Sequence, residues 1–162
     1  MTAIIPHAKC FVLFVGNDDH PPKEQYVSER LLREIGAKLS IPIEVLNSNW
    51  ISKLKLELLF KTIKNISAPD NRTCLLIAGA YLEDQITVCT LEALAEGFDA
   101  HLLTDLITAR DQGFTQTLLF RLFQAGAVPS TLKQFLYLWS AAEVGEREQT
   151  AVRQVIQKYF SN

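Results

Sequence analysis

The sequence has few features that would place it in a specialised class of protein. It contains three cysteines, Cys10, Cys74 and Cys89, in no CxxC or Cys/His spacing, which argues against a disulfide framework or zinc site and favours free thiols in a reducing compartment. It has no stretch near the roughly 18 unbroken apolar residues of a membrane span. Its first residues, MTAIIPHAK, lack the charged and apolar regions of a signal peptide. We therefore expect a cytoplasmic protein with no membrane partner.

An excess of one charge is also lacking. The 16 basic and 18 acidic residues give a formal net charge of -2, and the basic residues are scattered. Because nucleic-acid-binding domains usually carry a concentrated basic footprint, we expect no nucleic-acid partner. We also expect no cofactor and no metal. With 162 residues and 48% hydrophobic content, the chain can bury one substantial core.

The chain alternates between short apolar runs, typical of buried strands, and amphipathic segments, typical of helices. The predicted strands are residues 9–15, 41–46, 75–80 and 98–104. The predicted helices are residues 23–39, 54–66, 82–96 and 114–125. This alternation predicts an α/β fold, with a three-layer α/β/α, Rossmann-like arrangement around a mostly parallel sheet.

The most informative segment is one βαβ unit over residues 75–105. Its first strand ends in small residues, its helix is followed by Gly97, which suits the position just past a helix end, and its second strand closes on Asp105. In open α/β sheets, ligands bind beyond the carboxyl ends of the strands. The predicted ligand-binding residues are therefore Gly79, Ala80, Tyr81, Gln85 and Asp105.

This unit resembles the isochorismatase-like cysteine hydrolases, a family that includes nicotinamidases, carbamoylsarcosine amidases and isochorismatases. The shared features are a strand ending in Gly79, a helix, the triplet Gly97-Phe98-Asp99, a strand ending in Thr104-Asp105, and the later segment AGAVPSTLKQFLYLW. The resemblance implies the isochorismatase-like hydrolase fold. It also implies catalysis by a cysteine nucleophile with an aspartate and a lysine.

The sequence departs from this family at the nucleophile. Counting six residues from Gly79, or twelve back from Gly97, places the family's cysteine at Gln85. A glutamine cannot form the thioester. Cys89 lies one helical turn further on, where it is either a replacement nucleophile or a small buried apolar residue.

The polar side chains at this turn allow two interpretations. Glu83 and Asp84 stand in the first turn of the predicted helix, where the helix dipole stabilises carboxylates, so they are either helix-start residues or part of a site. Gln85 either holds a carboxylate or amide group of a ligand, or is a solvent-facing residue at the helix start.

The family's aspartate follows the first strand. In this sequence that position falls on Gly16 or Asn17, so Asp18 would serve only with a small shift. Asp18 and Asp19 beside His20 suggest acid/base chemistry or a metal site. Alternatively, these residues form a polar loop that caps the following helix.

The family's lysine lies before the helix that precedes the central strand. Lys53 and Lys55 are in this region, but they are equally compatible with the solvated face of an amphipathic helix. The candidate catalytic residues are therefore Asp18, Lys53 and Cys89. Only about eight residues connect the second strand to this helix. The resemblance implies a longer connection that helps to cover the substrate, so the short one would leave the site open to water.

Three functions remain open. The favoured one is a non-catalytic protein that binds a small molecule or an interaction partner through the predicted site. The second is a hydrolase of an amide or other C–N bond that uses Cys89 or an activated water. The third is a structural subunit of an oligomer. We expect residues 1–140 to form the domain, residues 141–162 to form an amphipathic helix packed on it or on a partner subunit, and the protein to be a homo-oligomer.

Overall fold

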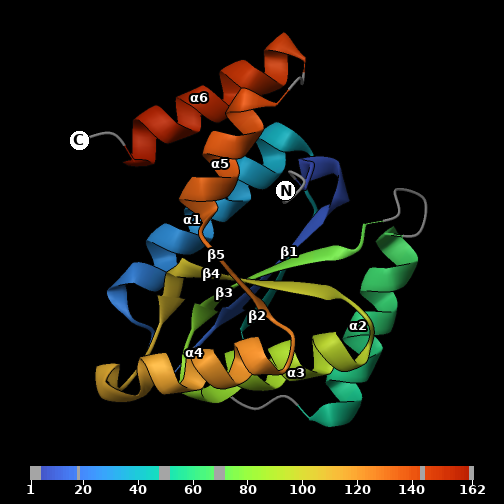
Figure 1. Cartoon of the computed structure of the whole chain (residues 1–162), viewed down its shortest axis with the longest axis vertical. Helices are drawn as coiled ribbons and strands as arrows, with labels where there is room; N and C mark the ends of the chain where they lie inside the picture. The colour runs from blue at the N-terminus through green and yellow to red at the C-terminus, as the bar shows by residue number, and fades with distance from the viewer. Residues whose placement is uncertain (1–4, 18, 48–51, 68–71, 143–144, 161–162) are drawn as a thin grey trace.

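A parallel sheet forms the centre of the molecule (Figure 1). The computed structural model describes residues 5–17, 19–47, 52–67, 72–142 and 145–160. Within these ranges the sheet has five strands, all parallel, in the order β2-β1-β3-β4-β5. Their bounds are β1 Cys10–Gly16, β2 Ile43–Asn47, β3 Cys74–Ala80, β4 Asp99–Thr108 and β5 Val128–Ser130. Strands β1 and β3 are apolar runs buried along their whole length, as expected for strands covered on both faces.

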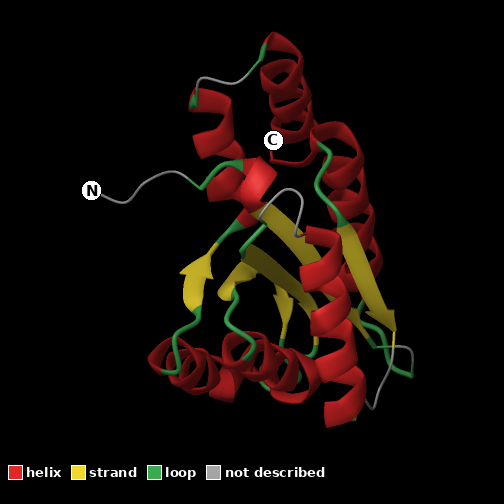
Figure 2. Ribbon diagram, turned by 90° about the vertical axis from the view of Figure 1, so that its right-hand side faces the viewer, coloured by secondary structure: helices red, strands yellow, loops and turns green. Residues whose placement is uncertain are grey.

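Helices cover both faces of the sheet and give three layers, as Figure 1 and Figure 2 show. The helices are α1 Lys23–Leu39, α2 Lys53–Ser67, α3 Thr87–Ala95, α4 Thr115–Gln124, α5 Leu132–Ala141 and α6 Glu146–Phe160. Helices α1 and α5 pack on one face with α6 against them, while α2, α3 and α4 pack on the other. The predicted three-layer α/β/α fold is confirmed.

Alternation along the strands divides the core in two. Val12 and Phe14 of β1 point into the cluster beneath α1, α5 and α6. Leu13 and Val15 point into the cluster beneath α2, α3 and α4. Because successive side chains of a strand face opposite sides, one apolar run supplies both clusters.

The end of β4 differs from the sequence-based prediction. This strand runs to Thr108 instead of ending at residue 104. The reason is a bulge: Ile77 of β3 pairs with Leu102, but Gly79, two residues later, pairs with Ile107. The β4 residues between these two pairs outnumber those of β3. Pairing with β3 therefore starts again further along β4, beyond the predicted end of the strand.

The C-terminal helix α6 packs on α1 and α5 of its own chain. Val152 and Val155 are buried in the core cluster on that side of the sheet. Glu34 of α1 accepts a hydrogen bond from the Tyr159 hydroxyl and pairs with Lys158 at 3.2 Å. The Tyr159 hydrogen bond, aided by Lys158 and Lys38, lowers the pKa of the Glu34 carboxyl to about 2.

We expect the Glu34→Gln substitution to destabilise the protein at neutral pH by about 1 kcal/mol, because it removes a charged acceptor from this contact. The lowered pKa stabilises the fold fully above about pH 4.5, the ordinary pKa of the carboxyl, and this contribution disappears as the pH falls to about 2. Urea unfolding of both proteins between pH 7 and pH 2.5 measures the difference. Glu24→Gln, at an exposed position of α1, is the control. If the difference in the free energy of unfolding between the two proteins stayed constant over this pH range, the stabilising role given to the Glu34 carboxylate would be wrong.

Candidate functional site

The carboxyl ends of β1 and β3 meet at Gly79. This residue has φ +126°, and a Cβ atom built on it would lie 1.9 Å from the carbonyl oxygen of Val15. Glycine is required here because no side chain fits and the backbone conformation is one that L residues rarely adopt. Gly79 and Ala80 are both buried, so they shape the turn after β3 rather than present side chains to solvent.

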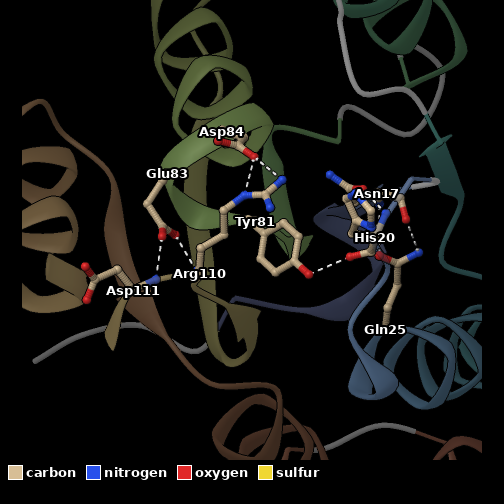
Figure 3. Close-up of polar contacts among 8 residues, drawn as sticks. All are labelled: Asn17, His20, Gln25, Tyr81, Glu83, Asp84, Arg110 and Asp111. Atoms are coloured by element: carbon tan, nitrogen blue, oxygen red, sulfur yellow. Dashed lines mark hydrogen bonds and ion pairs between the residues drawn. The ribbon is translucent and has the colours of Figure 1, made fainter. Parts of the chain in front are cut away.

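The predicted helix 82–96 does not begin as an α-helix. Residues Leu82–Ile86 form a π-helical turn (η3), in which Asp84 has non-helical dihedral angles of φ -104° and ψ -111°. Regular α-helix starts only at Thr87. This widened turn projects Tyr81, Glu83 and Asp84 toward the loops that follow β1 and β4 (Figure 3).

Tyr81 connects the loops on its two sides. Its hydroxyl donates a hydrogen bond of 2.5 Å to the backbone carbonyl of His20, in the loop after β1. The guanidinium group of Arg110, in the loop after β4, lies over the tyrosine ring at 4.1 Å from its centroid, which is a favourable cation–π geometry. The ring therefore lies between the loops that follow β1 and β4 and contacts both (Figure 3).

The two acidic residues of the turn hold the β4 loop in place. Asp84 accepts from Arg110 Nε at 2.9 Å and pairs with its terminal nitrogen at 2.8 Å. Glu83 accepts the backbone N–H groups of Arg110 at 3.0 Å and Asp111 at 2.8 Å. We call this set, Tyr81, Glu83, Asp84 and Arg110, the Tyr81–Arg110 bridge. Glu83 and Asp84 are thus more than helix-start residues, because both contact a loop 26 to 28 residues away in sequence.

The end of β1 carries an amide where the resemblance places an aspartate. Asn17 is 4% exposed, and its side-chain oxygen accepts the backbone N–H of His20 at 3.0 Å. Its own backbone N–H donates to Gln25 at 2.9 Å. These bonds order the loop before α1.

Asp18, the shifted catalytic candidate, lies outside the described residues. In the described ranges, no group of three or more His, Cys, Asp or Glu side chains could hold a metal ion.

Gln85, at the nucleophile position, is 7% exposed. It is therefore not the solvent-facing residue of one interpretation. It lies in the π-helical turn directly after the residues that make the Tyr81–Arg110 bridge.

The two other catalytic candidates lie in different environments. Cys89 is fully buried in the core between the sheet and the layer of α2, α3 and α4, and burial raises the pKa of its thiol to about 12. Lys53 is exposed at the first residue of α2. The thiol therefore lies in the core and the ammonium group on the surface, and the catalytic role of each stays a prediction.

Asp105 does not face the Gly79 turn. It lies within β4, and its carboxylate accepts the backbone N–H groups of Leu132 at 2.9 Å and Lys133 at 3.2 Å. These are the first residues of α5, so Asp105 satisfies unpaired N–H groups at a helix N-terminus. The predicted ligand-binding role of Asp105 depended on the strand ending at residue 104, which the bulge in β4 prevents.

Arg110 was not among the residues singled out from the sequence. It lies in an ordinary polar loop, ITARDQG, and no spacing connects it to Tyr81 or Asp84. Its importance follows only from the parallel pairing of β3 and β4, which brings the loops at their carboxyl ends together.

The five-stranded parallel sheet with helices on both faces defines the class of fold: the chain has the fold of the isochorismatase-like hydrolases, as the sequence resemblance implied. An isochorismatase-like hydrolase from Alkaliphilus metalliredigens overlaps 81% of this chain and 97% of its own length, with a TM-score of 0.51 and 10% identity. The MAR1 ribonuclease from Caenorhabditis elegans overlaps 95% and 92%, with a TM-score of 0.70 and 16% identity. YcaC from Escherichia coli, described as an octameric hydrolase of unknown specificity, overlaps 98% and 97%, with a TM-score of 0.63 and 16% identity.

At the level of sequence, no protein-family model and no curated protein matches this chain. Among the described residues, no helix is both long enough and apolar enough to cross a bilayer.

Proposed function

We propose that this protein is a non-catalytic member of its fold class that binds a small carboxylate at the crevice beside the Tyr81–Arg110 bridge. The observation that supports the proposal is the bridge itself. Its side chains connect the loops that follow β1 and β4, beside a turn in which Gln85 stands at the position that the resemblance gives to the nucleophile.

The loss of catalysis is supported by the chemistry of the available side chains. Thioester formation requires a thiolate near the substrate carbonyl. Gln85 has a carboxamide, which is not nucleophilic, and Cys89 is buried with a pKa of about 12. Lys53 is on the surface. None of these groups supplies an activated nucleophile at the crevice.

The carboxylate preference is supported by Arg110. Its guanidinium lies over the ring of Tyr81 and pairs with Asp84, and the side chains of Arg110 and Asp84 are 44% and 38% exposed. An ion pair this exposed is weak, so a ligand carboxylate can take the place of Asp84 at little cost. Guanidinium groups bind carboxylates through paired hydrogen bonds, and the planar groups of the half-buried Tyr81 and of Arg110 favour a flat ligand.

Binding and turnover are tested separately, with nicotinate and nicotinamide as probes. We expect calorimetric titration to detect nicotinate binding, and Arg110→Met to weaken it about tenfold or more, because a charge-assisted pair is lost while the aliphatic stem is kept. Arg121→Met, at an exposed position of α4, should bind as the unmodified protein does. Neither the unmodified protein nor Cys89→Ala should hydrolyse nicotinamide. Hydrolysis that Cys89→Ala abolishes would refute the non-catalytic proposal, and equal binding by both arginine variants would refute the binding site.

A further inference from the structure

The outward side of helix α2 carries exposed apolar residues. Leu56, Phe60 and Ile63 lie on its inward side and are buried in the core cluster beneath α2, α3 and α4. On the opposite side, Leu54 is 65% exposed and Leu58 is 56% exposed. These two leucines are one helical turn apart and contribute little to the core. They are therefore available for contact with a partner.

Lysines stand on both sides of these leucines. At about 100° of rotation per residue, Lys61 projects on one flank of the two leucines, and Lys55 projects on the other. Both lysines are exposed, and neither makes an ion pair with another described residue. We call Leu54, Leu58, Lys55 and Lys61 together the α2 ridge. In Figure 1, α2 lies at the margin of the molecule, where an extended surface can reach the ridge.

The charge of α2 contrasts with that of the rest of the chain. The helix has four lysines and one glutamate, a net charge of +3, in a chain whose net charge is -2, so the rest of the chain has a net charge of -5. Glu57, the one acidic residue of α2, is half-buried and lies below Lys61 on its flank. Lys64 is already paired with Glu96 at 3.3 Å. The exposed charge beside the two leucines is therefore positive, in an otherwise acidic protein.

We propose that the α2 ridge adheres to the surface of an anionic membrane. In this arrangement the helix lies along the bilayer surface, with Leu54 and Leu58 among the lipid headgroups and the lysines of both flanks against anionic groups. Charge complementarity supports this partner, because the unpaired positive charges of the ridge match the negative charge of such a surface. The same surface repels the acidic remainder of the chain, which orients the molecule with α2 toward the membrane.

A bilayer fits the ridge better than a protein partner does. A specific protein interface usually buries about 800 Å² on each partner, far more than two leucines and two lysines of one helix supply. A bilayer needs no matching shape and offers anionic headgroups to every lysine of the helix at once. The sequence predicts no membrane partner because it has no spanning segment, but adhesion to one leaflet does not require such a segment.

Co-sedimentation of the full chain with phospholipid vesicles tests the proposal. The vesicles contain either phosphatidylcholine alone or phosphatidylcholine with about 30% phosphatidylserine, which supplies the negative charge. At about 50 mM salt, where screening is weak, we expect binding to the anionic vesicles to be at least about tenfold tighter than binding to the neutral ones. Raising the salt to about 500 mM should release the protein, because the attraction between exposed charges is then screened.

Two lysine substitutions test the charged part of the ridge. Lys55→Gln combined with Lys61→Gln should weaken binding to the anionic vesicles about 30-fold, because each lysine near such a surface contributes about fivefold. The matched control removes two exposed lysines from the helices on the other face of the sheet, by Lys23→Gln on α1 and Lys133→Gln on α5. This control protein should bind as the unmodified protein does.

Two leucine substitutions test the apolar part. Leu54→Ser combined with Leu58→Ser should weaken binding about tenfold or more, whereas Tyr26→Ser combined with Val27→Ser should leave it unchanged. Tyr26 and Val27 are 61% and 59% exposed on α1, so the control removes apolar groups of similar exposure. Circular dichroism checks that each variant is folded.

Two outcomes would overturn the proposal. If the protein does not bind anionic vesicles, the ridge is not a membrane contact, and an acidic protein becomes the better candidate for its partner. If binding survives both the lysine and the leucine substitutions of α2, another surface of the chain makes the contact.

Discussion

Replacing Gly79 with alanine is expected to abolish stable folding, with a loss of more than about 4 kcal/mol in the free energy of unfolding. The new methyl carbon would lie 1.9 Å from Val15 O, 2.7 Å from Val15 C and 2.9 Å from Val15 N. All three atoms belong to the backbone of a central strand, so no side chain can move aside. Since small domains are stable by only about 5–15 kcal/mol, a loss of this size removes most of the stability of a domain at the lower end of that range.

Gly97→Ala is the matched control. Gly97 also has a positive φ, +89°, but a Cβ atom there has no neighbour within 4 Å. Only the conformational strain remains, which costs about 1–2 kcal/mol. Urea unfolding followed by circular dichroism should therefore show a folded Gly97→Ala protein and little or no folded Gly79→Ala protein. Equal losses for the two variants would mean that backbone conformation, rather than the contact between β1 and β3, makes Gly79 necessary.

The fold could be predicted because its information is local in the sequence. The apolar run that became β1 begins and ends within one residue of its predicted bounds, and the predicted helix 23–39 is α1 itself. The spacing of apolar residues along the sequence indicates which side chains are buried, and the burial of these side chains determines which segments become strands and helices. The bulge in β4 and the π-helical turn before α3 could not be predicted in this way, because both depend on which strand lies alongside and on contacts with distant loops.

The site was predicted less completely for the same reason. Topology predicts a site at the turn after Gly79, since parallel strands gather their carboxyl ends at one edge, and that site stays a prediction. The partners of that turn are His20 and Arg110, about 61 and 26 residues away from the residues they contact. Asp105, which the spacing favoured, caps α5 instead. Residue types alone do not distinguish a carboxylate that binds a ligand from one that caps a helix.

The thiol of Cys89 is expected to be almost inert toward iodoacetamide in the folded protein. Burial raises its pKa from 9.0 to about 12. This shift of three pH units lowers the thiolate fraction at neutral pH about a thousandfold, and the thiolate is the reactive form. The side chain is also 0% exposed, so the reagent cannot reach it without local unfolding. Peptide mass spectrometry of protein alkylated with and without urea should show that Cys89 reacts only when the chain is unfolded.

The control is a thiol on the surface of the same helical layer. Thr117 is exposed on α4, so Thr117→Cys should be alkylated at the rate of an ordinary free cysteine while Cys89 of the same molecule is not. The raised pKa also has a consequence for stability. Above about pH 9 the unfolded thiol ionises while the folded one stays neutral up to about pH 12, so the fold loses stability as the pH rises through this range, and Cys89→Ala removes that part of the loss. Rapid alkylation of Cys89 in the folded state would instead mean that its thiol is accessible to reagents. Cys89 would then again be a candidate nucleophile for a hydrolase.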